Sequence, residues 1–393
     1  MAPRGPAGSE TNGSGSLRRG SQSNRMSEAL VQRSFSAANA AGIFAEGSKF
    51  GAYVIGPCIG HGETGRIYRA EHEAIDSPLA LKVFTDEFSR SVMGRNRFLR
   101  EARHAATIRH PSVVNVFDVG VQSGVPYIVM ELLDGEDLDA LLHSRGALDE
   151  AAIIDLMVPI VAGLSSLHET GIVHGDIKTK SIFLVYRSPR EREPKLLDFG
   201  IARSASAEKL RRTSGTRGIF RGSALYVSPE AARGDDVTAL SDQYSIGVVL
   251  YECAVGVNPF AASAGDDAVR RVILGEYPPL ARHEARPTEA LVRIVERAMN
   301  LDPAGRYPDL KALGRDLLML ASERTRMTWS LSFGEARGGQ VVRRPGTTPM
   351  DAVYGFIDRV RGGWPQDFDW SSAAAIAFGV ITFAWGIAIL LSR

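Results

Sequence analysis

One short polar stretch, and one acidic residue downstream of it, contain the residue types that phosphate chemistry needs. Asp176 and Lys178 lie two positions apart in the run HGDIKTKS at 174–181, and Asp198 follows twenty-two positions after Asp176, directly before Phe-Gly. One carboxylate can orient a hydroxyl nucleophile, the ammonium can neutralise phosphate charge, and the second carboxylate can hold a metal ion. This spacing points to transfer of a phosphoryl group.

A glycine-rich segment earlier in the chain could hold the phosphates themselves. Gly60, Gly62 and Gly65 form the pattern G-x-G-x-x-G. Glycines allow backbone N–H groups to approach phosphate oxygens, because no side chain stands in the way. A dinucleotide-binding fold places such glycines between a strand and a helix, whereas strand-like residues 66–71 follow them here. The pattern therefore favours a hairpin over phosphates, with an ordinary glycine-rich hairpin as the alternative.

Lys82 lies inside an apolar, strand-like run at 79–84. An unpaired ammonium is costly to bury, so this lysine needs an acidic partner. Glu101, in the helix-like segment 95–109, is the expected one. A single Glu on a helix is more often solvent-exposed, but its distance along the chain from Lys82 favours the pairing.

The elements that must position these residues form two groups along the chain. The pattern of apolar residues predicts strands at 52–59, 66–71, 79–84, 113–121 and 126–132. Helical periodicity recurs later, at 153–170, 242–255, 267–274, 289–300 and 310–321. Five strands with one helix, followed by mostly helices, predict an α+β protein with two lobes. The Ser-, Gly- and Arg-containing residues 1–46 are predicted to be a disordered tail, and 322–371 a polar juxtamembrane linker.

Taken in order, the motifs resemble those of protein kinases, and in detail those of the bacterial, eukaryotic-like serine/threonine kinases. The resemblance spans residues 51–320. It implies the bilobal protein-kinase fold, with a small five-stranded antiparallel β lobe and one helix at 51–130 and a larger, mainly helical lobe at 134–320. It also implies ATP and Mg²⁺, with Mn²⁺ as an alternative metal, and Ser/Thr hydroxyls of proteins as substrates.

The resemblance implies a role for each matching position. Asp176 and Lys178 would be catalytic, Asp198 and Ser181 would bind the metal, and Met130 would be the gatekeeper beside the adenine. The backbone of Glu131 and Leu133 would bond the purine edge, between Ala80 and Phe183. The full set of implied ATP-binding residues is Ile59, Gly60, Gly62, Gly65, Ile67, Ala80, Lys82, Glu101, Met130, Glu131, Leu133 and Phe183. Candidate phosphorylation sites in the activation loop are Thr213, Ser214 and Thr216, and structural roles fall to Glu230, its buried partner Arg306, and Asp242.

Two positions depart from the family's pattern. Gly175 replaces an Arg that often pairs with a phosphorylated activation loop, so the usual partner of such a phosphate is missing. Ser181 replaces the Asn that gives the metal a carbonyl oxygen, and a hydroxyl is a shorter and weaker ligand. An active but slower kinase is the favoured interpretation. A pseudokinase that binds nucleotide or a partner is the alternative, and a lipid or small-molecule kinase is a third.

The segment 373–391 is a run of nineteen uncharged, mostly apolar residues, which matches a hydrocarbon core of ~30 Å. We expect a single-pass helix that anchors the protein in the cell (inner or plasma) membrane by its C-terminal end, with a buried core helix as the alternative. Arg359 and Arg361 before the segment favour a cytoplasmic kinase domain. Small residues four apart, Ala375/Gly379 and Thr382/Gly386, could pair two such helices in a homodimer.

Composition excludes several other classes of protein. The net charge of +1 gives no overall field for nucleic acid, so no nucleic-acid partner is expected. The two cysteines, Cys58 and Cys253, are too few for a disulfide framework and lack metal-ligand spacing. A reducing compartment follows from this cysteine usage.

Overall fold

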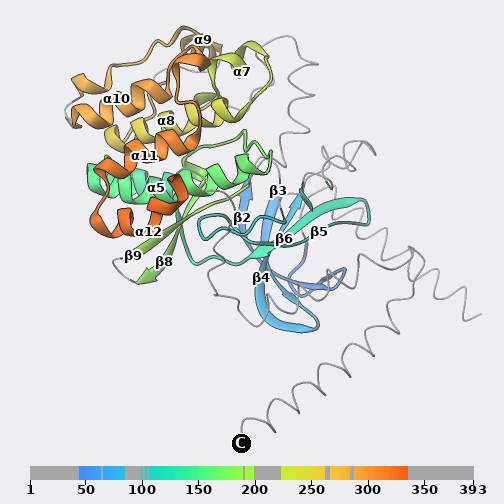
Figure 1. The fold of residues 1–393 in the computed structure, drawn as a ribbon. Helices are drawn as coiled ribbons and strands as arrows, with labels where there is room; N and C mark the ends of the chain where they lie inside the picture. Colours follow the sequence, from blue (N-terminus) through green and yellow to red (C-terminus); the bar gives the residue numbers. More distant parts are fainter. Residues whose placement is uncertain are drawn as a thin grey trace, which may run out of the picture. The chain divides into compact units, whose positions relative to one another are not determined.

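The computed structural model describes residues 44–62, 65–84, 99, 102–103, 106–188, 191–198, 223–261, 266–283 and 287–334. Within them the predicted division into a strand-rich and a helical lobe is confirmed (Figure 1). The predicted disordered tail, most of the helix at 95–109, and the anchor segment 373–391 lie wholly or largely outside the described residues.

The N-terminal lobe is a six-stranded antiparallel sheet. Its strands are β1 (Lys49–Phe50), β2 (Tyr53–Gly62), β3 (Gly65–His72), β4 (Ile75–Phe84), β5 (Val116–Gln122) and β6 (Val125–Glu131), in the order β1-β2-β3-β4-β6-β5. Five of these match the predicted strands, and β1 is an addition. Successive side chains of a strand point to opposite faces, and here one face packs a separate aromatic cluster in which Phe44 lies edge-on to Phe50 and Tyr68. The folded lobe therefore begins before residue 51.

The helical lobe is built around α5 (Glu150–Glu169) and α8 (Ala239–Val255), both largely buried. Around them lie α4 (Leu138–Arg145), α7 (Pro229–Arg233), α9 (Asp266–Leu274), α10 (Glu289–Ala298) and α11 (Leu310–Leu320). Among the described helices α5 has the length and hydropathy of a membrane span, but 67% of its most apolar window is buried within the protein. Its apolar surface belongs to the core of this lobe.

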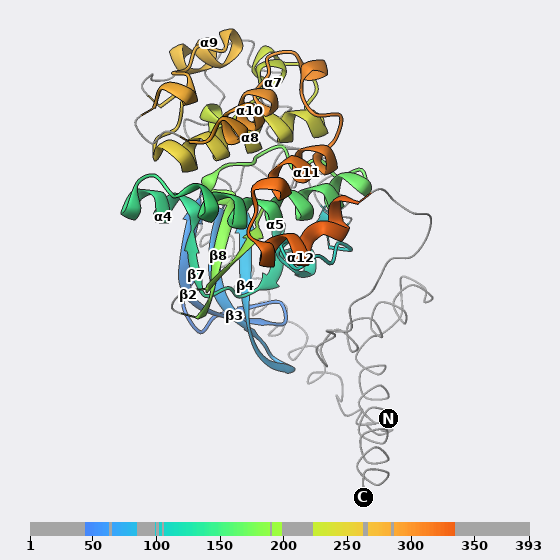
Figure 2. The ribbon, with the colours of Figure 1, turned by 60° about the vertical axis from the view of Figure 1, so that its left-hand side comes forward.

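A second, three-stranded sheet is formed by one strand that follows β6 and two strands that follow Ser181. It contains β7 (Gly135–Asp137), β8 (Ile182–Ser188) and β9 (Glu191–Leu196), in that order and antiparallel; Figure 2 labels β7 and β8, and Figure 1 labels β8 and β9. None of these three strands was predicted from the sequence. One of them carries a candidate site residue: Phe183 on β8 pairs with Asp137 of β7 on one side and Lys195 of β9 on the other.

The last described helix, α12 (Glu323–Phe333), lies where a linker was predicted. Its composition is polar, but Phe333 is fully buried, and a Cβ added to Gly314 of α11 would lie 2.1 Å from the Phe333 ring. Trp329 packs against His110 with 5.5 Å between ring centroids. Helices α5, α11 and α12 lie side by side in Figure 1 and contact one another. Phe333 and Trp329 thus hold α12 against the helical lobe, although the polar average composition of this segment predicted a linker.

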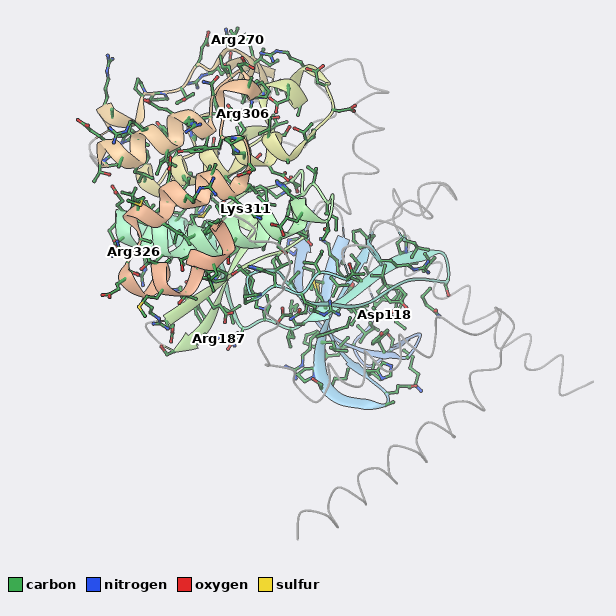
Figure 3. All side chains as sticks on the ribbon, viewed as in Figure 1. Asp118, Arg187, Arg270, Arg306, Lys311 and Arg326 are labelled. Atoms are coloured by element: carbon green, nitrogen blue, oxygen red, sulfur yellow. The ribbon has the colours of Figure 1, made fainter. Side chains whose placement is uncertain are left out.

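Glu230 and Arg306 form the buried ion pair that joins α7 to the loop before α11 (Figure 3 labels Arg306). Two guanidinium nitrogens donate to the two Glu230 oxygens at 2.9 and 2.8 Å, and Ser241 Oγ donates to Oε1 at 2.8 Å. Burial alone would raise the pKa of Glu230, but these hydrogen bonds outweigh it and lower the pKa to about 2.

Replacing Glu230 with Gln should therefore destabilise the protein in a pH-dependent way. The Glu230 pKa falls from 4.5 to about 2 on folding, so the ion pair stabilises the fold fully above about pH 4.5 and loses this contribution as the pH falls towards 2. We expect E230Q to lower the free energy of unfolding by about 3 kcal/mol at pH 7, and by ~1 kcal/mol less near pH 3.5. Urea unfolding at both pH values measures this.

The control is Glu289→Gln, because Glu289 pairs with Arg293 at 3.4 Å on the exposed surface of α10. An exposed pair contributes about 0–1 kcal/mol. Equal effects of the two substitutions, or a loss in E230Q that does not change with pH, would contradict the assigned role of Glu230.

Candidate active site

The loop that carries Asp176 is held by a buried carboxylate from another element. Asp242, on α8, is 1% exposed. Its Oδ2 accepts the His174 N–H and the His168 Nε2–H, each at 2.8 Å, and its Oδ1 accepts the Gly175 N–H at 2.6 Å. Gly175 has a φ of 71°, in the left-handed region that favours glycine. The loop therefore turns at Gly175 with its N–H groups directed at α8.

His174 connects this loop to the segment that ends in Asp198. Its ring is fully buried, and burial lowers its pKa, so the neutral form is favoured. Nε2 lies 2.8 Å from the Leu197 carbonyl, and Nδ1 accepts the Asp176 N–H at 3.3 Å. These partners require the tautomer with its hydrogen on Nε2. One neutral ring thus fixes the backbone beside both acidic residues of the site.

Asp176 and Lys178 form the first charged pair of the site. Lys178 Nζ donates to Asp176 Oδ2 at 2.7 Å. Their side chains are 35% and 21% exposed, so solvent or a substrate can reach both. A carboxylate and an ammonium at this separation can contact a hydroxyl and a phosphate oxygen at the same time.

Lys82 and Asp198 form the second pair, at 2.6 Å between Nζ and Oδ1. Desolvation of the Asp198 carboxylate by the surrounding protein groups opposes its ionisation, but the Lys82 ammonium outweighs this effect and holds the pKa of that carboxyl below its usual range. Asp198 also has a φ of 58°, which is uncommon for a non-glycine residue. The predicted partner of Lys82, Glu101, lies outside the described residues, as do Thr213, Ser214 and Thr216.

Ser181 lies at the end of the same loop, in the short 3₁₀ turn Thr179–Ser181. Its hydroxyl donates to the Lys178 carbonyl at 2.7 Å and accepts the Lys178 N–H at 2.9 Å. The residue is 3% exposed. The structure thus places Ser181 beside the catalytic pair, and its role as a metal ligand stays a prediction.

The glycine-rich segment forms the predicted hairpin. Gly62 at the end of β2 pairs with Gly65 at the start of β3. A Cβ at Gly65 would lie 2.1 Å from the Val83 carbonyl oxygen, so this position has no room for a side chain. Ile59 is 51% exposed on β2, and Ile67 of β3 is half-buried against the core. The hairpin therefore packs directly onto the strand that carries Lys82.

The predicted adenine-binding residues lie close to this hairpin's sheet. Ala80 on β4 pairs with Met130 on β6, and both are buried. The Glu131 N–H already donates to the Asn115 carbonyl at 3.0 Å. Leu133 follows β6 and is half-buried, as is Phe183 on β8. The structure therefore places these residues at the junction of the two lobes.

Two sets of side-chain interactions at the site were not predicted from the sequence. The Glu131 side chain accepts from buried Lys195 of β9 at 2.7 Å and from the Asn115 N–H at 2.8 Å. In the catalytic loop, Thr179 Oγ1 lies 2.9 Å from Tyr226 Oη, which donates to Glu252 at 2.6 Å. No local pattern marks these residues, because each interaction joins segments far apart in the chain.

The comparisons with known proteins agree with this geometry. A family model described as protein kinase domain matches residues 53–317. The chain is 32% identical over 339 residues to the serine/threonine-protein kinase pkn3 of Myxococcus xanthus, covering 84% of this chain and 61% of that protein. It is also 32% identical over 277 residues to the serine/threonine-protein kinase PknH of Mycobacterium tuberculosis, covering 70% of this chain and 42% of that protein. The chain thus spans less than two thirds of the length of these relatives.

A solved structure supports the fold independently. The crystal structure of the Mycobacterium tuberculosis PknI kinase domain superposes with a TM-score of 0.56 at 23% identity, and the match covers 70% of this chain and 98% of that one. The two-lobed arrangement is therefore shared.

Replacing Asp242 with Asn should loosen the loop without removing any group of the two charged pairs. The NH₂ group of Asn cannot accept a hydrogen bond, and it would face the N–H of His174 or of Gly175. At least one of these buried donors would lose its charged acceptor. We expect hydrogen exchange at the 174–176 amides to accelerate and the free energy of unfolding to fall by ~2–4 kcal/mol. Asp316→Asn is the control, since Asp316 accepts from Tyr307 Oη away from the loop. Unchanged exchange in D242N would refute the positioning role.

Proposed function

The chain belongs to the protein kinase family, and we propose that it is an ATP-dependent kinase that phosphorylates Ser and Thr hydroxyls of proteins. The observation that carries this proposal is the pair of salt bridges Lys82–Asp198 and Asp176–Lys178, at 2.6 and 2.7 Å, on either side of the shared His174 ring. Both pairs combine a carboxylate with an ammonium, which is the set of groups that phosphoryl transfer requires.

In the proposed reaction, Asp176, Lys178 and Lys82 each have a separate role. Asp176 accepts a hydrogen bond from the substrate hydroxyl and orients its oxygen towards the γ-phosphorus. As the new P–O bond forms, the bond from γ-phosphorus to the β-phosphate oxygen breaks, and ADP leaves. Lys178 neutralises charge on the transferred group, and Lys82 binds the α- and β-phosphates. The hydroxyl proton passes to Asp176 or to solvent.

A divalent cation, Mg²⁺ or Mn²⁺, would neutralise phosphate charge at this site when bound. Asp198 fits it, because its side chain is 41% exposed, carries an ionised carboxylate and reaches the same space as Lys82. The described residues contain no group of three or more His, Cys, Asp or Glu side chains that could hold a metal on their own. Phosphate oxygens would therefore supply the remaining ligands.

Transfer from γ-labelled ATP to a general protein acceptor tests the proposal on the full chain, with Mg²⁺ or Mn²⁺. Asp176→Asn should lower the rate at least ~100-fold, because orientation of the nucleophile is lost, while nucleotide binding persists. Lys82→Met should weaken nucleotide binding, because a phosphate contact is lost. Lys49→Met is the matched control, since Lys49 pairs with Glu73 on the exposed edge of the same lobe.

The outcomes separate the proposed function from its alternative. Label incorporation that disappears in D176N but not in K49M supports a protein kinase. Nucleotide binding without transfer under both metals would identify the chain as a pseudokinase. Label found in lipid and not in protein would identify a different acceptor class.

We also propose that residues 373–391 anchor the chain in the cell membrane as a single C-terminal span, with the kinase domain in the cytoplasm. The support is composition alone: nineteen uncharged residues with Trp370 before them and Arg393 after them. Gly379 and Gly386 in small-xxx-small spacings could pair two copies. A membrane-bound homodimer would place two kinase domains within reach of each other.

Cell fractionation measures the proposed anchoring. The full chain should remain in bacterial membranes after an alkaline carbonate wash. Val380→Arg with Ala384→Arg should release it, because each central charge costs ~2.5–3.5 kcal/mol in a spanning helix. The pair Val380→Leu and Ala384→Leu is the control and should stay membrane-bound. A wild-type chain in the soluble fraction would overturn the anchoring proposal and leave the kinase proposal untouched.

A further inference from the structure

We propose that Ser181 is a positioning residue that fixes the main chain of Lys178, and that it does not bind the divalent cation. The first half stands on the geometry of the loop alone. The second half rests on the proposed kinase function, since it concerns the metal that this function requires. Together they change the role that resemblance implied for this position.

The main-chain N–H and the main-chain carbonyl of Lys178 both form hydrogen bonds with Ser181. The Lys178 N–H donates to Ser181 Oγ at 2.9 Å. The Lys178 carbonyl accepts from Ser181 Oγ at 2.7 Å and from the Ser181 N–H at 2.9 Å. With its main chain held from both sides, Lys178 extends its ammonium to Asp176 at 2.7 Å. The serine therefore determines where the base of the Lys178 side chain lies.

The main chain of Ser181 also bonds the segment that leads to Asp198, the proposed metal ligand. Its carbonyl accepts the Leu197 N–H at 2.8 Å, and Leu197 directly precedes Asp198. Beyond it, Ile182 pairs with Leu196 in the sheet of β8 and β9. One residue thus bonds both the segment of Lys178 and the segment of Asp198.

The hydroxyl is poorly suited to hold a cation as well. An Asn can donate through its amide nitrogen while its carbonyl oxygen faces a metal, whereas a Ser has one oxygen for both purposes. In Ser181 that oxygen has given its hydrogen to Lys178 and accepts a second hydrogen bond. Ser181 is also 3% exposed, whereas 41% of the Asp198 side chain and 35% of the Asp176 side chain are open. The side chains of Asp176 and Asp198 are thus accessible, whereas Ser181 is buried.

The test compares Ser181→Ala with the wild-type full chain by two independent measurements. Hydrogen exchange without nucleotide or metal reports on the Lys178 amide, and we expect about five- to tenfold faster exchange in S181A. Electron paramagnetic resonance of Mn²⁺ with a non-hydrolysable ATP analogue counts bound ions, and we expect the same number and a Kd within about twofold. Ser181→Thr, which keeps the hydroxyl, should restore slow exchange.

Ser228→Ala is the control, because Ser228 is also a buried serine, 2% exposed, whose hydroxyl accepts a main-chain N–H, that of Ala231 at the start of α7. It should leave exchange at Lys178 unchanged. Loss of one Mn²⁺ in S181A, or a Kd raised tenfold or more, would overturn the second half of the proposal. Exchange at the wild-type rate would overturn the first half.

Two further outcomes remain decisive. If S181A does not fold, Ser181→Asn replaces it: an added carbonyl oxygen should tighten Mn²⁺ or add a second ion, and no change in either would contradict the proposal. If the wild-type chain binds neither nucleotide nor Mn²⁺, the kinase function fails. The exchange measurement then still decides whether Ser181 positions Lys178.

Discussion

A buried carboxylate is costly unless donors surround it, and Asp242 meets this condition with the main chain of the catalytic loop. Two of its three hydrogen bonds come from N–H groups of His174 and Gly175. The carboxylate needs these donors, and the loop needs an acceptor outside itself, so each stabilises the other. Because Asp242 lies on α8 inside the helical core, the position of Asp176 is determined by the packing of that lobe.

Further contacts link the loop to the segment of Asp198 and to the sheet lobe. His174 bonds the carbonyl of Leu197, the residue before Asp198. Asp198 in turn forms an ion pair with Lys82 of the sheet lobe. Through Ser181 the loop also fixes Lys178. Most of these bonds join a side chain to main chain, whereas the charged groups of Asp176, Lys178 and Asp198 bond to one another or to Lys82. Apart from the buried Asp242 carboxylate, the positioning groups His174 and Ser181 are neutral.

Spacing along the chain was sufficient to predict the two lobes and the five main strands. It also selected Lys82, Asp176, Lys178 and Asp198, which form two ion pairs in the structure, while their roles stay predictions. These features depend on local periodicity and on short motifs, which one sequence contains. The sheet of β7, β8 and β9 was not predicted. Strand β7 is three residues long and pairs with β8 far along the chain, and β9, although it forms a hairpin with β8, has the largely polar sequence EREPKL. Lys195 was not expected to reach Glu131, because the two residues lie far apart in the chain. At Ser181 the residue type suggested a metal ligand, a role that stays a prediction; the hydrogen bonds of its hydroxyl to its own loop could not be read from the sequence.

Helix α12 has a consequence for where the folded unit stops. Gly314 leaves a hollow in α11 that the Phe333 ring fills, and Ser322 and Trp329 bond and pack against Asp155 and His110. A fragment cut at residue 320, the end suggested by motifs, would remove Phe333 from the surface of α11 and expose the apolar side chains that it covers. The compact unit therefore includes α12 and ends at residue 334.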